Sequence, residues 1–234
     1  MPDRIIGILG GMGPEATADF FREIVRLTPA RKDQDHIPVL IYSNSHIPDR
    51  TEAILGKGEN PLPHLIHSAR VLEGAGAGIL AVPCNTAHYF LPELERAVSI
   101  PFLDMLFETL GDLQSRLPAV RRVGLLASAG TVRCEIFHRV FQTRGVQVLV
   151  PATGDQEVVS RAIYRVKAGD CSQNTRSAFA SAGEKLVALG AEAIILGCTE
   201  IPLVLREKDV SCPCLNPTVA LAQAAVDWAL GKRN

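Results

Sequence analysis

The sequence predicts an α/β protein built from two similar Rossmann-like halves, each a short parallel sheet flanked by helices. Short apolar runs alternate with longer helical stretches along the chain, which is typical of βα units on a parallel sheet. The series of runs also starts again about half-way along the chain. Cys84 and Cys198 each end an apolar run and lie 114 residues apart, which indicates an internal duplication.

The first half opens with an apolar run over 4–11 that predicts a strand, and Pro14 suits the first turn of the helix that follows. The rest of this half predicts a helix through 15–28, a strand over 37–44, a loop over 45–61, a helix over 62–76, a strand over 78–84 and a short strand over 100–105.

The second half repeats this order and closes the chain with a helix. It predicts a strand over 121–128, a helix over 129–145, a strand over 146–151, a helix over 155–170, a helix over 175–190, a strand over 191–198, a short apolar run over 212–217 and a last helix over 218–232.

Three landmarks recur at a nearly constant interval. The strand glycines Gly7 and Gly124 are 117 residues apart, the two cysteines 114, and Asp104 and Asn216 112. A Gly-Ala pair also stands eight and seven residues before each cysteine. We therefore predict a first domain of residues 1–105 plus 217–234 and a second of residues 106–216.

Composition limits the possible partners and location. The 24 Lys and Arg residues nearly balance the 25 Asp and Glu residues, and no basic block occurs, so we expect neither a nucleic-acid partner nor a membrane partner. The first residues lack the long apolar segment and cleavage site of a signal peptide, which favours the cytoplasm. Six scattered cysteines in such a chain are expected to stay reduced.

Polar residues follow both cysteines at the predicted strand ends. Asn85 and Thr86 follow Cys84, while Thr199 and Glu200 follow Cys198. In open parallel sheets ligands bind beyond the carboxyl ends of the strands, so these residues are expected to face a site. We also expect each polar group to cap a helix whose positive end stabilises a thiolate. If the halves face each other, two thiols would approach one ligand from opposite sides.

The other four cysteines are interpreted as packing residues. Cys134 and Cys171 lie within or near helical patterns, and a small apolar filler is the ordinary role of a free cysteine. Cys212 and Cys214 form a C-x-C pair, but no matching Cys or His pair stands at zinc-site spacing. No metal site is predicted.

Three motifs together resemble the aspartate/glutamate racemase family. They are "GILGGMGPEAT" over 7–17, "PCNTAH" over 83–88 and "LGCTEIP" over 196–202, and the resemblance covers the whole chain in order. Glutamate racemases typically have Asp-Ser in the first loop and His two residues after the second cysteine. This chain has Gly-Met and Glu200 at those places, so it is more similar to the aspartate racemase branch.

The resemblance implies a racemase without a cofactor, acting on aspartate or glutamate and assembled as a homodimer. It implies that Cys84 and Cys198 remove and return the α-proton on opposite faces, with Cys198 serving the L-enantiomer. Arg50 and Lys167 match places where the family binds the side-chain carboxylate. The remaining expected substrate contacts are Met12 as a pocket wall, Asn85, Thr86, Thr131 and Thr199 at the α-carboxylate and amine, and Glu200 at the ammonium group.

Several alternatives stay open at this point. The segment from Gly11 to Ala16 fits a dinucleotide-binding pattern, but the second predicted strand ends on Asn44 and Ser45 rather than an acidic residue. A broad-specificity amino-acid racemase would share the same motifs. One thiolate could instead attack an sp² carbon, as in maleate isomerases. A two-lobed binding protein for small anions is a further alternative.

Overall fold

The computed structural model describes residues 4–233 and divides the chain into two compact units. One unit runs to Glu108 and resumes at Thr218, and the other spans Thr109–Pro217. Each unit holds a four-stranded sheet whose strand pairs are all parallel. Helix α5 (Met105–Arg116) begins in the first unit and ends in the second. The prediction of an α/β chain with two such sheets is confirmed.

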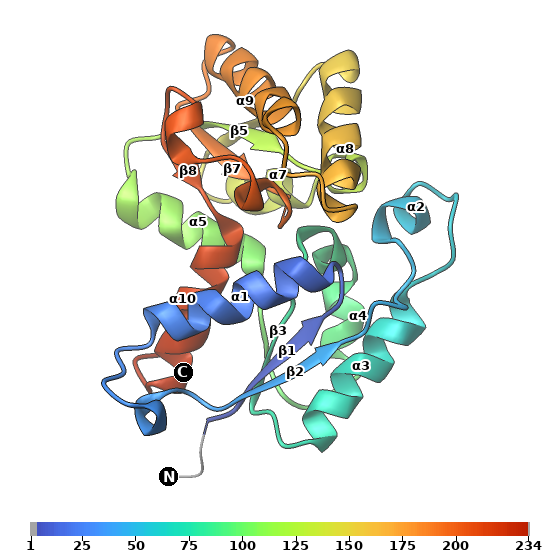
Figure 1. Cartoon of the computed structure of the whole chain (residues 1–234), viewed down its shortest axis with the longest axis vertical. Coiled ribbons are helices and arrows are strands. Elements are labelled where there is room, and N and C mark those ends of the chain that lie inside the picture. The colour runs from blue at the N-terminus through green and yellow to red at the C-terminus, as the bar shows by residue number, and fades with distance from the viewer. Residues whose placement is uncertain (1–3, 234) are drawn as a thin grey trace. The chain divides into compact units, whose positions relative to one another are not determined.

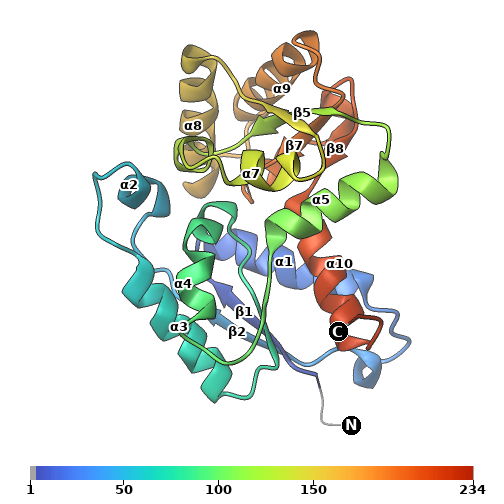
Figure 2. The ribbon, with the colours of Figure 1, turned by 180° about the vertical axis from the view of Figure 1, so that it is seen from behind.

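The first unit has its strands in the order β2-β1-β3-β4. Helices α1 and α10 cover one face of this sheet, and α3 and α4 cover the other (Figures 1 and 2). The elements are β1 (Ile6–Gly10), α1 (Pro14–Leu27), η1 (Asp33–Asp35), β2 (Val39–Ser43), α2 (Arg50–Ile54), α3 (Leu62–Gly74), β3 (Ile79–Ala81), η2 (Asn85–Phe90), α4 (Leu91–Glu95), β4 (Phe102–Leu103) and α10 (Pro217–Ala229).

The second unit has the equivalent order, β6-β5-β7-β8. Helices α8 and α9 pack together over a large apolar core that also holds Cys198. The elements are β5 (Arg122–Leu126), α6 (Ala129–Arg133), α7 (Ile136–Gln142), β6 (Gln147–Leu149), α8 (Thr153–Lys167), α9 (Gln173–Ala188), β7 (Ala193–Leu196), η3 (Ile201–Leu203), η4 (Glu207–Asp209) and β8 (Cys214–Leu215).

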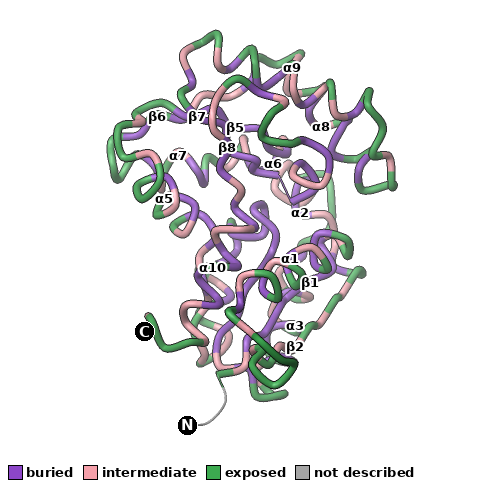
Figure 3. The backbone as a smooth tube through the Cα atoms, turned by 60° about the vertical axis from the view of Figure 1, so that its left-hand side comes forward, coloured by how far each residue is buried: buried purple, intermediate pink, exposed green. Residues whose placement is uncertain are grey.

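The central strands are apolar throughout because helices cover both faces of each sheet. All five residues of β1 and all four of β7 are buried, and both strands are continuous in the buried colour of Figure 3. Edge strand β2 is only partly buried, with intermediate and exposed residues, and its Ile41 is exposed. In residues 4–233 we find no helix that is long and apolar enough to cross a membrane.

The duplication extends to backbone conformation. Gly76 and Gly190 each lie in the turn that leads from a helix into the third strand of their sheet, and their φ angles are +97° and +96°. L-residues with a side chain rarely adopt this left-handed conformation, which closes a helix at low cost only with glycine. The same turn is therefore built the same way in both halves.

We expect Gly76→Ala to lower the free energy of unfolding by about 1–2 kcal/mol, because alanine must adopt the left-handed conformation there. A Cβ at Gly76 would meet no atom within 4 Å, so the cost is purely conformational. Gly74→Ala is the matched control, since Gly74 is helical and equally open. Urea denaturation will measure both, and equal effects of the two substitutions would contradict the argument.

Two local predictions are wrong. The segment 45–61 is not all loop, because Asp49 accepts hydrogen bonds from the backbone N–H groups of Thr51 and Glu52 and starts helix α2. The helix predicted over 129–145 is two helices, α6 and α7. Glu135 has a φ of +54° and interrupts the helical path between them.

Candidate functional site

The first loop after β1 is packed tightly against the end of β2. Gly11 has a φ of +94°, and a Cβ there would lie 2.3 Å from the carbonyl carbon of Asn44. The Gly11 N–H donates to Thr17 Oγ1 over 2.9 Å, and the same hydroxyl donates to the Gly13 carbonyl. Met12 is buried by this arrangement and belongs to the same apolar cluster as Cys84. Met12 therefore forms part of the apolar surroundings of the cysteine.

Cys84 lies three residues beyond the end of β3 and is 6% exposed. Its thiol has no hydrogen bond to any residue in 4–233. The following segment is the 3₁₀ helix η2, and the Cys84 side chain does not cap it. The expected helix follows as a short 3₁₀ segment, in which i→i+3 bonds tighten the turn, and the side chain at its N-cap makes no capping hydrogen bond.

Asn85 is a buried residue of the first unit, and none of its side-chain polar atoms has a partner among residues 4–233. It is 2% exposed, and neither Nδ2 nor Oδ1 has a hydrogen bond within the described part of the chain. A buried amide without partners costs free energy, typically about 1–3 kcal/mol for each unsatisfied group. An amide that both donates and accepts is suited to a ligand that carries a carboxylate and an ammonium group.

Arg50 is the first residue of α2 and is 7% exposed. Its Nη1 donates to the carbonyls of Ile47 and Pro48 over 3.2 and 3.0 Å, while Nε is buried without a partner. Among residues 4–233 no carboxylate pairs with this guanidinium. Helix α2 contacts η2, so this buried cation belongs to the same edge of the first unit as Asn85. A buried cation without a counterion favours the binding of an anion.

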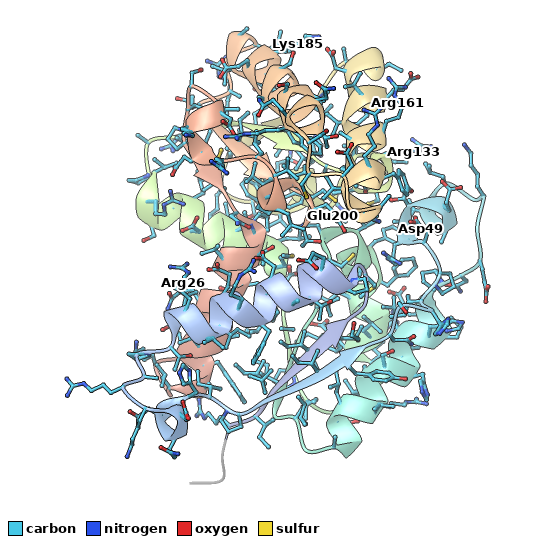
Figure 4. All side chains as sticks on the ribbon, in the orientation of Figure 1. Arg26, Asp49, Arg133, Arg161, Lys185 and Glu200 are labelled. Carbon is cyan, nitrogen blue, oxygen red and sulfur yellow. The ribbon has the colours of Figure 1, made fainter. Side chains whose placement is uncertain are left out.

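Cys198 lies two residues beyond β7 and is 7% exposed. Its thiol donates to Glu200 Oε2 over 3.3 Å, and the Thr199 hydroxyl donates to the same oxygen over 3.5 Å. Glu200, labelled in Figure 4, is 4% exposed and immediately precedes the three-residue 3₁₀ helix η3. The expected helix is again a short 3₁₀ segment, and the side chain at its N-cap makes no capping hydrogen bond. The carboxylate is engaged by the two residues before it.

Ser128 and Thr131 close the loop after β5. The Ser128 hydroxyl caps α6 by accepting from the Thr131 N–H, and it lies 3.1 Å from the Thr131 hydroxyl. Thr131 is fully buried, so its hydroxyl is held against Ser128. Gln156 of α8 lies beside this loop, because its Nε2 donates to the Ala127 carbonyl over 2.9 Å.

Gln156 is a candidate ligand residue that the sequence analysis missed. Its Nε2 donates to both Ala127 and Ser160, which fixes the amide orientation and turns Oε1 away from those partners. Oε1 is buried and has no hydrogen bond within the described part of the chain. Nothing local in the sequence around Gln156 indicates this position at the carboxyl end of β5.

Comparison with known proteins gives the family. Residues 9–225 match the family described as Asp/Glu/hydantoin racemase. The chain belongs to this family. It is 29% identical over 236 residues to the broad-specificity amino-acid racemase RacX of Bacillus subtilis, with 97% of this chain and 98% of RacX covered. The family prediction is thereby confirmed, and the chain is a racemase.

Two solved structures are similar to this racemase over nearly its whole length. An aspartate racemase from Picrophilus torridus has 30% identity and a TM-score of 0.86, covering 97% of this chain and 94% of that one. An aspartate racemase homologue from Pyrococcus horikoshii has 25% identity and a TM-score of 0.77, covering 97% and 99%.

Lys167 of the racemase lies at the end of a helical hairpin. Gln156 places the start of α8 at the carboxyl end of β5, whereas α9 passes β5 from Leu126 to Arg122. Asp155 near the start of α8 pairs with Lys185 near the end of α9, so the two helices are antiparallel. The far end of α8 therefore projects beyond the carboxyl edge of the sheet. Lys167 is exposed there, and its Nζ lies 5.2 Å from the centre of the Tyr164 ring.

The surroundings of the remaining four cysteines do not favour a reactive thiolate. Burial raises the pKa of the Cys134 and Cys212 thiols, and it raises the pKa of Cys214 to about 12, so these groups stay neutral near pH 7. Cys171 is exposed in the loop between α8 and α9. Across residues 4–233 no group of three or more His, Cys, Asp or Glu side chains is arranged to hold a metal ion.

Proposed function

We propose that this racemase acts without a cofactor on acidic amino acids, with aspartate as the leading substrate. Cys84 and Cys198 would exchange a proton with opposite faces of the α-carbon. The observation that carries the proposal is that each unit places one buried cysteine just beyond the third strand of an equivalent sheet. Polar residues follow both cysteines: the Asn85 amide has no hydrogen-bond partner within the described residues, and the Glu200 carboxylate accepts from Thr199 and Cys198.

The proposed reaction moves one proton at each face. The thiolate of one cysteine accepts the α-proton, and the electron pair of the C–H bond stays on the substrate as a carbanion. The thiol of the other cysteine then donates its proton to the opposite face and becomes the thiolate. The reverse reaction exchanges the two roles. The 3.3 Å contact between Cys198 Sγ and Glu200 Oε2 supports a protonated Cys198 in the half-reaction in which Cys84 is the base.

The carbanion needs nearby donors, because no charge is delocalised onto a cofactor in this proposal. Preorganised hydrogen-bond donors aimed at a developing charge are the largest source of such stabilisation in many enzymes. We assign Asn85, Thr86 and Thr199 to the α-carboxylate and the ammonium group. Thr131 would act by holding Ser128, and Met12 by excluding water from Cys84.

Arg50 supports a preference for substrates with an acidic side chain. A buried guanidinium without a counterion in its own unit favours a substrate that brings a second carboxylate. Lys167 is proposed to add a second positive charge from the other unit. The full-length similarity to RacX favours a second candidate, a racemase of broad specificity, in which this cation matters less. As implied by the family resemblance, we also expect a cytoplasmic homodimer.

Incubation with L-aspartate in deuterium oxide tests the proposal. We expect the α-proton signal to disappear from the NMR spectrum while D-aspartate forms, because each turnover exchanges that proton with a thiol that equilibrates with solvent. A panel of acidic and neutral L-amino acids under the same conditions separates the two candidates. Absence of exchange with every member of the panel would contradict the racemase mechanism.

A further inference from the structure

His88 is buried in η2, four residues after Cys84, and both of its ring nitrogens are hydrogen-bonded. Nδ1 lies 2.9 Å from the carbonyl oxygen of Cys84. Nε2 lies 3.1 Å from the backbone nitrogen of Met105. The ring therefore joins the main chain at one proposed catalytic residue to a residue 17 positions further along the chain.

These two partners fix the state of the imidazole. A carbonyl oxygen only accepts, so Nδ1 must carry the hydrogen that it donates to Cys84. A backbone N–H only donates, so Nε2 must be the acceptor for Met105. The ring is consequently neutral with its proton on Nδ1. Neither nitrogen is available to take the proton of the Cys84 thiol.

The other hydrogen bonds of the Cys84 main chain are local, and its N–H donates to the Val82 carbonyl over 2.7 Å. Strand β3 ends at Ala81, and Cys84 is in an extended conformation with φ −156° and ψ 106° before the 3₁₀ turn begins. Its carbonyl also accepts from the Ala87 N–H over 3.1 Å, within the same short turn. The bond from His88 is thus a side-chain restraint on the peptide group that carries the Cys84 side chain.

The other end of the bridge is the start of a longer element. Met105 is the first residue of α5, and Asp104 Oδ1 accepts from the next two N–H groups, of Leu106 and Phe107. His88 accepts the N–H of Met105 itself, so ring and carboxylate together satisfy the first turn of the helix. Helix α5 begins in the first unit and continues into the second at Thr109. Met105 therefore starts the helix that joins the two units along the chain.

We infer that His88 is a positioning residue, which holds the Cys84 main chain against the start of α5 and so sets the direction of the Cys84 thiol. This inference rests on the proposed function for the role of Cys84, but the contact itself does not. The test must therefore report on Cys84 with and without turnover. It must also separate the bond to Cys84 from the bond to Met105.

Two substitutions make that separation. In His88→Asn the amide nitrogen takes the place of Nδ1 and keeps a donor for the Cys84 carbonyl, while the acceptor for Met105 is lost. In His88→Gln the amide oxygen reaches the place of Nε2 and keeps the acceptor for Met105, while the donor to Cys84 is lost. Both variants lose one buried hydrogen bond, so urea denaturation should give similar losses of stability.

The readouts are the rate of alkylation of Cys84 by iodoacetamide, followed by peptide mass spectrometry, and kcat and KM for racemisation. We expect His88→Gln to lose about 10–10²-fold in kcat with little change in KM, because a displaced reacting group costs rate rather than binding. The alkylation rate of Cys84 should change at least about fivefold in His88→Gln, and His88→Asn should stay within about threefold of the wild type on both measures.

Cys198, in the other unit, is the internal control for alkylation and should be unaffected. Equal losses of kcat in the two variants, or unchanged alkylation of Cys84 in His88→Gln, would overturn the inference. Failure of both variants to fold would also overturn it, since the ring would then be needed for the fold itself. If the wild type proves not to racemise amino acids, the alkylation rates still decide the positioning role, so the two failures are distinguishable.

Discussion

Cys198→Ala and Cys84→Ala should each reduce racemisation of L-aspartate by at least about 10³-fold, because the proposed mechanism gives each face of the α-carbon a single thiol as its proton carrier. Detection of D-aspartate by chiral chromatography measures this loss. The two variants should also differ from each other in deuterium oxide. Each keeps one thiol, so each should exchange the α-proton of one enantiomer only, and the enantiomer should be opposite in the two variants.

Cys171→Ala is the matched control, because Cys171 is an exposed cysteine in a loop of the same unit as Cys198. It should racemise aspartate at the wild-type rate. Wild-type racemisation by Cys198→Ala would contradict the assignment of two cysteines. Circular dichroism will show whether a loss of activity is caused by unfolding. In that case Cys84→Ser and Cys198→Ser, which keep the volume of the side chain, replace the alanine variants.

The duplicated fold is the part that the sequence predicts best. Short apolar runs that alternate with helical stretches predict parallel strands buried on both faces. The strand order is equivalent in the two units. The repeat is visible in the sequence at landmarks such as Gly76 and Gly190, and the matching φ angles of these residues show why they recur. Backbone conformations that only glycine adopts easily are visible in a sequence, because they restrict the residue type.

The local errors have physical causes that are partly visible in the sequence. The D-x-x-E pattern from Asp49 to Glu52 is a start signal for a helix, so α2 is predictable from the sequence. Glu135 in a left-handed conformation gives no such signal, because a glutamate within a helical pattern predicts a continuous helix.

The candidate site is predictable in its cysteines but not in its supporting contacts. Cys84 and Cys198 stand out because strand ends and polar residues recur around them. The bond from Met105 to His88 and that from Gln156 to Ala127 join residues 17 and 29 positions apart. Such pairs depend on the fold and leave no local pattern. The partnerless state of Arg50 Nε and Asn85 is likewise a property of packing rather than of sequence.

Arg50→Met should lower kcat/KM for aspartate by about 10²–10³-fold, because the proposed charge-assisted hydrogen bonds from Arg50 to the side-chain carboxylate of the substrate would be lost. The same change should leave the free energy of unfolding unchanged or raise it by about 1 kcal/mol. The reason is that methionine fills a similar volume and removes a buried cation that has no counterion in its unit. Steady-state kinetics and urea denaturation measure the two effects on one preparation.

Arg96→Met is the matched control, since Arg96 is exposed at the end of α4, where its Nε donates to the Pro92 carbonyl over 2.9 Å and its Nη2 lies 3.7 Å from Glu93. It should change neither quantity by more than about 0.5 kcal/mol. A neutral amino acid in the substrate panel sharpens the test, because its racemisation by Arg50→Met should be spared. Equal losses for aspartate and for a neutral substrate would show that Arg50 supports the fold of the site rather than the recognition of a second carboxylate. If Arg50→Met loses activity but keeps its stability, burial of the Arg50 cation costs stability in the free protein and is compensated by the binding of an anionic substrate.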